Sequence, residues 1–149
     1  MAQKYYPFYN VSAAVGPGAS NATDDVMLVQ FFLREIAKDQ SVGPQGRPPT
    51  PLTVDGVYGP NTAAWIAWFQ NSMNAKFAGS TYADGRVDPA RGMSNDPKFL
   101  KSTISHTQYT IVSLNATYRF RYKASHNALD EDPRVPQPLR QALAAGDYA

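Results

Sequence analysis

The feature that most constrains the fold is a turn that leads directly into an amphipathic helix. The turn reads Asp-Gly-Val-Tyr-Gly-Pro-Asn-Thr over residues 55–62. Apolar residues then recur at helical spacing, at Ile66, Phe69 and Met73. Gly56 can adopt a positive φ without a Cβ clash. Pro60 suits the first position of a helix because that position needs no N–H. The pattern therefore predicts a helix over residues 61–74.

An earlier segment, residues 24–37, has the pattern of a second amphipathic helix. Its apolar stripe is formed by Val26, Val29, Leu33 and Ile36, with Phe32 beside it. Asp24 and Asp25 fall in the first turn, where the helix dipole stabilises negative charge. We therefore expect these two carboxylates to stabilise the start of the helix rather than to act as a catalytic pair.

Together the two segments resemble the non-catalytic peptidoglycan-binding domains of cell-wall proteins. The family pattern is Asp-Val-x-x-Leu-Gln-x-x-Leu, a loop, Asp-Gly-x-Phe/Tyr-Gly-Pro-x-Thr, and then a helix that ends in Phe-Gln. Residues 25–33 match the first half, with Val29 where Leu is usual, and residues 55–70 match the second. The resemblance covers residues 15–72. It implies a small three-helix domain that binds peptidoglycan without cleaving it.

The segment between the two motifs, residues 38–51, departs from the family pattern. It reads Lys-Asp-Gln-Ser-Val-Gly-Pro-Gln-Gly-Arg-Pro-Pro-Thr-Pro, which is longer and richer in proline than the typical connection. A groove built partly from this segment would therefore differ in shape from the groove of the family.

A second turn further along the chain repeats the first. Residues 84–89 read Asp-Gly-Arg-Val-Asp-Pro, which has the same shape as residues 55–60. A third helical pattern follows over residues 108–123. Its apolar positions are Ile111, Leu114, Tyr118 and Tyr122. This echo of the family pattern, over residues 84–115, predicts the order helix, turn, helix, turn, helix.

These patterns define a mainly α fold: a small three-helix, peptidoglycan-binding-like domain with long loops and extended arms at both ends. A chain of 149 residues is long enough for one domain with a modest core. We expect an aromatic N-terminal arm over residues 1–23, the helical domain over residues 24–126, and a Pro-rich tail with a short helix over residues 127–149.

Both arms carry apolar residues that need a surface to pack against. The N-terminal candidates are Tyr5, Tyr6, Phe8 and Tyr9, and the C-terminal candidates are Leu139 and Leu143. One interpretation is that each arm folds back onto its own domain. The other is that each arm docks into a neighbouring subunit, which would make these side chains partner-binding residues of a homo-oligomer or larger assembly.

The sequence contains no recognisable catalytic or metal-binding pattern. There is no cysteine, and the two histidines, His106 and His126, have neither His-x-x-x-His spacing nor a neighbouring glutamate. Glu35 lies on the body of a predicted helix, where Arg34 or Lys38 can pair with it in solvent. Nothing isolates it in the apolar pocket that a glycosidase acid needs. We expect a protein that is not an enzyme and holds no cofactor or metal.

The first turn and the helix that follows supply the candidate ligand-binding residues. Sugar rings stack on exposed aromatic faces, and Trp65 and Trp68 lie three residues apart on the predicted helix. The alternative is that these rings pack in a small core beside Ile66 and Phe69. In the family that the chain resembles, the ligand contacts come from a groove near the turn. The matching positions here are Tyr58, Asn61, Thr62 and Trp65.

A formal net charge of +2 is too small to require a nucleic-acid or membrane partner. Arg119, Arg121 and Lys123 alternate with aromatic residues, but Arg121 does not share a helix face with the other two. We interpret this patch as the solvated end of a helix, where cations complement the dipole. No nucleic-acid partner is expected.

The N-terminus lacks the apolar core of a secretory signal, and no segment approaches the ~20 apolar residues that span a bilayer. We therefore expect synthesis in the cytoplasm and a place in a virion or a machine of the cell envelope. Two functions are compatible with these observations. The first is binding of peptidoglycan or a related glycan as part of a phage or an injection apparatus. The second is a structural subunit that reuses the fold and contacts other subunits through its arms.

Overall fold

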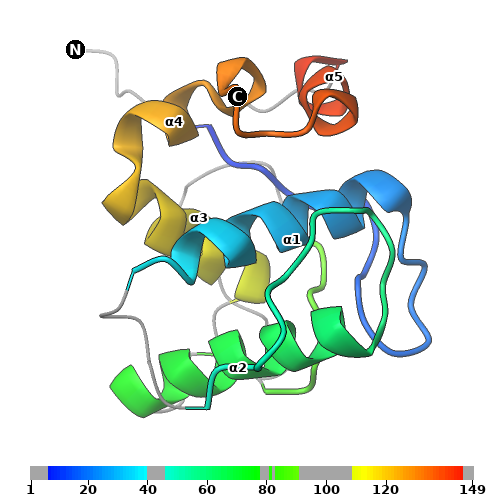
Figure 1. Ribbon diagram of the computed structural model, residues 1–149, viewed down its shortest axis with the longest axis vertical. Helices are drawn as coiled ribbons and strands as arrows, with labels where there is room; N and C mark the ends of the chain where they lie inside the picture. The colour runs from blue at the N-terminus through cyan, green and yellow to red at the C-terminus, as the bar shows by residue number, and fades with distance from the viewer. Residues whose placement is uncertain (1–6, 40–45, 78–80, 82, 91–108, 146–149) are drawn as a thin grey trace.

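The computed structural model describes residues 7–39, 46–77, 81, 83–90 and 109–145 (Figure 1). The elements are α1 (Thr23–Ile36), α2 (Pro60–Lys76), α3 (Thr110–Arg121), α4 (Lys123–Asn127), a 3-10 turn η2 (Leu129–Glu131) and α5 (Gln137–Ala145). An antiparallel bridge joins Val15 and Val87. The mainly α class predicted above is therefore confirmed.

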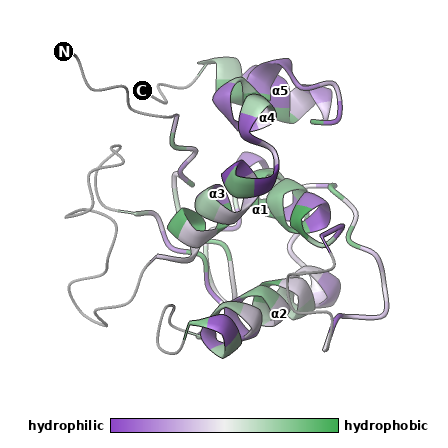
Figure 2. Ribbon diagram, turned by 90° about the vertical axis from the view of Figure 1, so that its left-hand side faces the viewer, coloured by the Kyte–Doolittle hydropathy of each residue, from purple (hydrophilic) through white to green (hydrophobic). Residues whose placement is uncertain are grey.

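The helices are stacked on three levels. α1 and α3 lie side by side in the middle, α2 lies on one side of this pair, and α4 and α5 lie on the other (Figure 1, Figure 2). The predicted helices over residues 24–37, 61–74 and 108–123 correspond to α1, α2 and α3. Each predicted end differs from the observed end by one or two residues. The short helix predicted in the tail corresponds to α5, which begins at Gln137.

α1 is buried on nearly every side because it lies between the other levels. Its predicted apolar stripe is buried, and so are the rings of Phe31 and Phe32 on the neighbouring face. Both rings contact the ring of Tyr118 on α3, with centroid distances of 5.7 and 5.1 Å. Tilted aromatic pairs at this distance add to the stabilisation that burial provides. α1 is therefore the centre of the core.

The described part of the N-terminal segment, from residue 7 on, packs against the helices. Phe8 and Tyr9 are 1% and 4% exposed and belong to the main core. The Tyr9 amide donates to Asn115 Oδ1 at 3.0 Å, and Asn115 Nδ2 donates back to the Tyr9 carbonyl at 2.9 Å. The Tyr9 hydroxyl donates to the His126 carbonyl at 2.7 Å. Of the two interpretations offered for this arm, Phe8 and Tyr9 adopt the one in which it folds back onto its own domain. Tyr5 and Tyr6 lie outside the described residues.

The C-terminal tail also packs on its own domain. Leu139 and Leu143 on α5 are 1% and 4% exposed, and α5 lies against α1. The amphipathic pattern of α5 needs an apolar surface, and α1 provides it within the same chain. Of the two surfaces considered for these leucines, they pack on their own domain. The described parts of the three predicted segments share a single core.

Two acidic residues of α1 have roles that the sequence did not suggest. Asp25 accepts hydrogen bonds from the Ser12 amide and hydroxyl at 2.8 and 2.7 Å and from the Ala13 amide at 3.1 Å. Its carboxylate thus fixes the N-terminal segment against α1. Glu35 was expected to form pairs in solvent, but its side chain is fully buried, and Arg134, which precedes α5, donates to it at 3.0 Å. The burial arises because α5 and the segment before it cover this face of α1.

The first predicted turn is fixed by one side chain of α1. Gln30 Nε2 donates to Asp55 Oδ1, to the Val57 carbonyl and to Thr62 Oγ1 at 3.0, 3.1 and 3.0 Å. Gln30 Oε1 accepts from the amides of Asp55 and Gly56 at 3.0 and 2.9 Å. The side chain is buried, so these bonds satisfy polar groups that water does not reach.

The second turn is held in the same way by a glutamine of α2. Gln70 Nε2 donates to the Arg86 carbonyl and to Thr110 Oγ1, each at 3.0 Å, and more weakly to Asp84 Oδ1 at 3.4 Å. Gln70 Oε1 accepts from the Gly85 amide at 2.9 Å. The predicted order of helix, turn, helix, turn, helix is therefore confirmed, with a glutamine of each helix holding the turn that follows it.

Candidate binding groove

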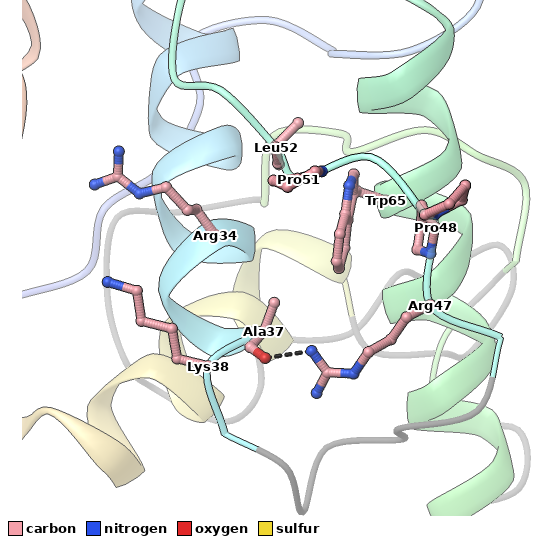
Figure 3. Close-up of a pocket in the computed structure, with 9 residues that line it drawn as sticks. Arg34, Ala37, Lys38, Arg47, Pro48, Pro51, Leu52 and Trp65 are labelled. Atoms are coloured by element: carbon pink, nitrogen blue, oxygen red, sulfur yellow. Dashed lines mark hydrogen bonds between the residues drawn. The ribbon is translucent and has the colours of Figure 1, made fainter.

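A groove lies between the C-terminal end of α1, the proline-rich segment after it and the side of α2 (Figure 3). Its volume is about 390 Å³. The lining residues are Arg34, Ala37, Lys38, Arg47, Pro48, Pro49, Pro51, Leu52 and Trp65. One wall therefore comes from the segment in which the chain departs from the family pattern.

Arg47 holds this wall against the end of α1. Its guanidinium donates to the carbonyls of Ala37 and Asp39, the second at 3.0 Å (Figure 3). The last carbonyls of a helix have no partner within the helix and carry the negative end of its dipole, so a cation is stabilised there. The same guanidinium lies over the ring of Trp68, with its carbon 5.0 Å from the ring centroid.

Two residues near the start of α2 hold the other end of the proline-rich segment. The Trp65 indole N–H donates to the Thr50 carbonyl at 2.8 Å, and Asn61 Nδ2 donates to the Pro51 carbonyl at 3.1 Å. Trp65 lines the groove but is only 5% exposed. Its ring packs edge-on against Trp68, with centroids 5.2 Å apart. Of the two interpretations offered for these tryptophans, packing in the core is the one that the structure adopts.

The other two predicted ligand-binding residues lie in the turn and do not line the groove. Thr62 is buried, and its hydroxyl accepts a hydrogen bond from Gln30. Tyr58 is partly buried against the core, and this burial raises the pKa of its hydroxyl. The four predicted residues thus fall into two pairs. Trp65 and Asn61 shape the groove, whereas Thr62 and Tyr58 belong to the turn.

Sequence reasoning missed the cations of the groove. Arg34 and Lys38 line the α1 side, and their side chains are 32% and 57% exposed. Both pair with the buried carboxylate of Glu35, at 3.0 and 2.9 Å. Figure 3 shows their charged ends directed away from Trp65 and from the groove, so that only their stems line it. The sequence did offer a signal: Arg34 and Lys38 lie four residues apart and so share one face of the helix, and the loop that follows contains Arg47.

His126 is a core residue and not a base in a site. It is 2% exposed, its Nε2 lies 2.9 Å from Asn115 Oδ1, and Arg119 lies 3.3 Å from its Nδ1. Burial and the nearby Arg119 charge lower the pKa of His126 to about 4. His106 lies outside the described residues. In the described part of the chain, no group of three or more His, Cys, Asp and Glu residues could hold a metal ion.

A second hollow, of about 300 Å³, lies between the C-terminal end of α2 and the side of α3. Its lining includes Phe77 and Phe120, which are 62% and 91% exposed. Large apolar side chains that lie together in water indicate a contact surface more often than isolated ones do. Among the helices that the structure describes, none is both long and apolar enough to cross a membrane.

Comparison of the chain with protein-family models, with curated proteins and with solved structures finds no match. The residues and their geometry are therefore the basis for a functional proposal.

Proposed function

We propose that this chain is a non-catalytic module that binds peptidoglycan, as a component of a larger particle such as a phage or an injection apparatus. The observation that carries the proposal is the groove beside the first turn. Two residues that match the family motif shape it: Trp65 lines it, and Asn61 holds its proline-rich wall. The volume of about 390 Å³ lies in the range of small-ligand sites.

The composition of the groove supports binding without cleavage. Glycoside hydrolysis uses two carboxylates on either side of the scissile bond, about 5 to 10 Å apart. No aspartate or glutamate is among the residues that line the groove. Glu35 lies behind the α1 wall, fully buried and paired with Arg34, Lys38 and Arg134.

The first test is co-sedimentation with insoluble sacculi, with cellulose as the control for unspecific pelleting. Ala37→Phe places a large side chain in the groove at a half-buried position and should abolish selective retention. Ala64→Phe is the matched control, because Ala64 is exposed on α2 and does not line the groove. Equal retention of both variants, or none by the folded parent protein, would contradict the proposal. A fall in the turbidity of the sacculi would contradict the absence of catalysis.

A second candidate function is a structural subunit of an assembly that reuses this fold. The described residues proposed for that role, Phe8, Tyr9, Leu139 and Leu143, are buried. The exposure of Phe77 and Phe120 in the second hollow instead favours a protein contact there. The partner that we propose for this surface is a second copy of the chain. Light scattering should then give a dimer mass that falls to the monomer mass in Phe120→Ser. A monomeric parent protein at high concentration would exclude this candidate.

A further inference from the structure

Each of the two glutamine-held turns contains an Asp-Gly pair. The pairs are Asp55-Gly56 and Asp84-Gly85. Asp-Gly is the dipeptide in which an aspartate isomerises most readily, because glycine has no Cβ to shield its amide nitrogen from the neighbouring carboxyl group. The turns therefore contain the two positions of the sequence that are most prone to this change of the backbone.

Isomerisation of an aspartate proceeds through a cyclic imide. The glycine amide nitrogen loses its proton and attacks the carboxyl carbon of the aspartate side chain. A C–N bond forms, and the neutral carboxyl group loses its hydroxyl as water. A second water then opens the ring, so no atom is gained or lost overall. When it breaks the original peptide bond, the chain runs through the side chain as isoaspartate, with one more methylene group in the backbone.

Both turns restrain this reaction in the folded chain. The amide of Gly56 donates to Gln30 Oε1, and the amide of Gly85 donates to Gln70 Oε1, each at 2.9 Å. Both glutamines are 1% exposed. An amide that donates to a buried acceptor gives up its proton slowly, so the ring can close only when the turn opens.

The first turn is packed more tightly around its glycine than the second. Gly56 is buried, whereas Gly85 is partly exposed. A Cβ on Gly56 would lie 2.6 Å from Thr23 Cγ2, whereas a Cβ on Gly85 would have no atom within 4 Å. Ring closure brings the carboxyl carbon up to the glycine nitrogen, and the open turn has more room for this movement.

The aspartate of the first turn is also held more firmly. Gln30 accepts from the Asp55 amide and donates to its carboxylate, both at 3.0 Å, whereas Gln70 donates to the Asp84 carboxylate at 3.4 Å. The Val57 amide and Gln30 keep the pKa of the Asp55 carboxyl below its usual range. Less of the neutral form, which must lose water, is therefore present at residue 55.

We propose that Asp84 is a site of spontaneous isomerisation in the folded protein, and that Asp55 is protected from it. The extra methylene group at residue 84 would move the Arg86 carbonyl away from Gln70, which also bonds Thr110 at the start of α3. Isoaspartate at this position therefore loosens the connection between α2 and α3. The reaction needs no ligand and is independent of the groove.

Prolonged incubation of the chain at neutral pH and body temperature tests this assignment, with a second sample kept unfolded in urea. Endoprotease Asp-N cleaves before aspartate but not before isoaspartate, so digestion after incubation measures residues 55 and 84 separately. In urea the two sites should isomerise at similar rates, because the dipeptide is the same. In the folded chain residue 84 should isomerise at least about tenfold faster than residue 55, a ratio that corresponds to roughly one hydrogen bond.

A matched pair of glutamine variants tests the restraint itself. Gln70→Ala should accelerate isomerisation at residue 84 at least about tenfold and leave residue 55 unchanged, whereas Gln141→Ala, on the exposed side of α5, should change neither site. If Gln70→Ala does not fold, the folded and urea samples of the parent chain still decide. Equal rates at the two sites of the folded parent, a faster rate at residue 55, or no isoaspartate at residue 84 once the urea sample has converted would overturn the assignment.

Discussion

The two glutamine-held turns share a pattern of hydrogen bonds, to which Gln30 adds one from the Asp55 amide. In each, the glutamine Nε2 reaches an aspartate, a backbone carbonyl and a threonine hydroxyl, and Oε1 accepts from the amide of a glycine. Gly56 and Gly85 have the same φ of 76°. In each turn the aspartate Oδ1 also accepts from the amide two residues on. The geometry of the turn is therefore set by the glutamine and the Asp-Gly pair.

The two turns differ in the length of chain that separates the glutamine from its aspartate. Gln30 and Asp55 are 25 residues apart, whereas Gln70 and Asp84 are 14 apart. The long connection of the first half lies before its turn, and part of it forms the wall of the groove. The comparison teaches that a turn held by one side chain leaves the length of its connection free. The first connection could therefore be long enough to supply one wall of the groove.

The largest expected effect comes from removing the glutamines. Gln30→Ala removes the five hydrogen bonds of this side chain to the first turn and should lower the free energy of unfolding by about 4 kcal/mol. Gln70→Ala should lower it by about 3 kcal/mol, because Gln70 makes four such bonds and the one to Asp84 is longer. Urea denaturation measures both. Gln141→Ala, an exposed glutamine of α5, is the control and should change stability by less than about 0.5 kcal/mol. A smaller effect at Gln30 than at Gln70 would contradict the comparison.

The next largest effect on stability comes from replacing the glycine of each turn with alanine, because the two glycines have different surroundings. A Cβ at Gly56 would lie 2.6 Å from Thr23 Cγ2 and 3.2 Å from the Thr23 carbonyl, whereas a Cβ at Gly85 would meet open space. Gly85→Ala should therefore cost only the strain of its positive φ, about 1 to 2 kcal/mol, and Gly56→Ala about 3 kcal/mol.

The same denaturation experiment checks the glycine prediction, with one further variant. Adding Thr23→Ala to Gly56→Ala removes the closest atom and should restore part of the lost stability. Equal costs at the two glycines, or no recovery in the double variant, would show that the first turn is not packed more tightly than the second.

Acid should destabilise the fold through His126, a residue that lies outside both turns. The pKa of His126 is lowered to about 4, so between pH 6.5 and 4 the unfolded chain binds a proton that the folded chain excludes. Stability should fall by about 3 kcal/mol as the pH falls through this window. The pKa of Asp55 is held below its usual range by the Val57 amide and Gln30, so Asp55 titrates below the window.

His126→Gln supplies the control for the acid effect. It removes the titrating group while keeping a donor for Asn115, so the variant should show a flatter stability profile between pH 6.5 and 4. The difference in stability between Gln30→Ala and Gln70→Ala should stay constant over the same window. If this difference changed with pH, a group in one of the turns would have to titrate between pH 6.5 and 4.

Much of the helical framework was predictable from local patterns. The periodicity of apolar residues and the Asp-Gly turns locate α1, α2 and α3, because local backbone preferences decide these features. The repeat of Asp-Gly at residues 84–85 also indicated a second turn of the same kind. Gln30 and Gln70 are positions of the family pattern quoted above, but their role in holding the turns was not identified, because a glutamine inside an amphipathic helix gives no sign of what it bonds.

The ends of the chain and the groove were not predictable in the same way. Phe8, Tyr9 and Leu139 are apolar enough to pack on this domain or on another, and only the tertiary fold decides between the two. Glu35 looked solvent-exposed because the segment that covers it lies about a hundred residues away in the chain. The groove depends on Arg47 meeting the end of α1, a contact between a loop and a helix that no periodic pattern encodes.

The contacts of Tyr9 have a consequence for the order of folding. Its bonds to Asn115 and to the His126 carbonyl join residues 106 and 117 positions apart. Closing a loop of that length costs entropy that only a nearly complete core can offset. The N-terminal segment is therefore expected to join the structure after the helices have assembled, and to leave it first. A destabilising change at Tyr9 should accelerate unfolding and leave the rate of folding nearly unchanged.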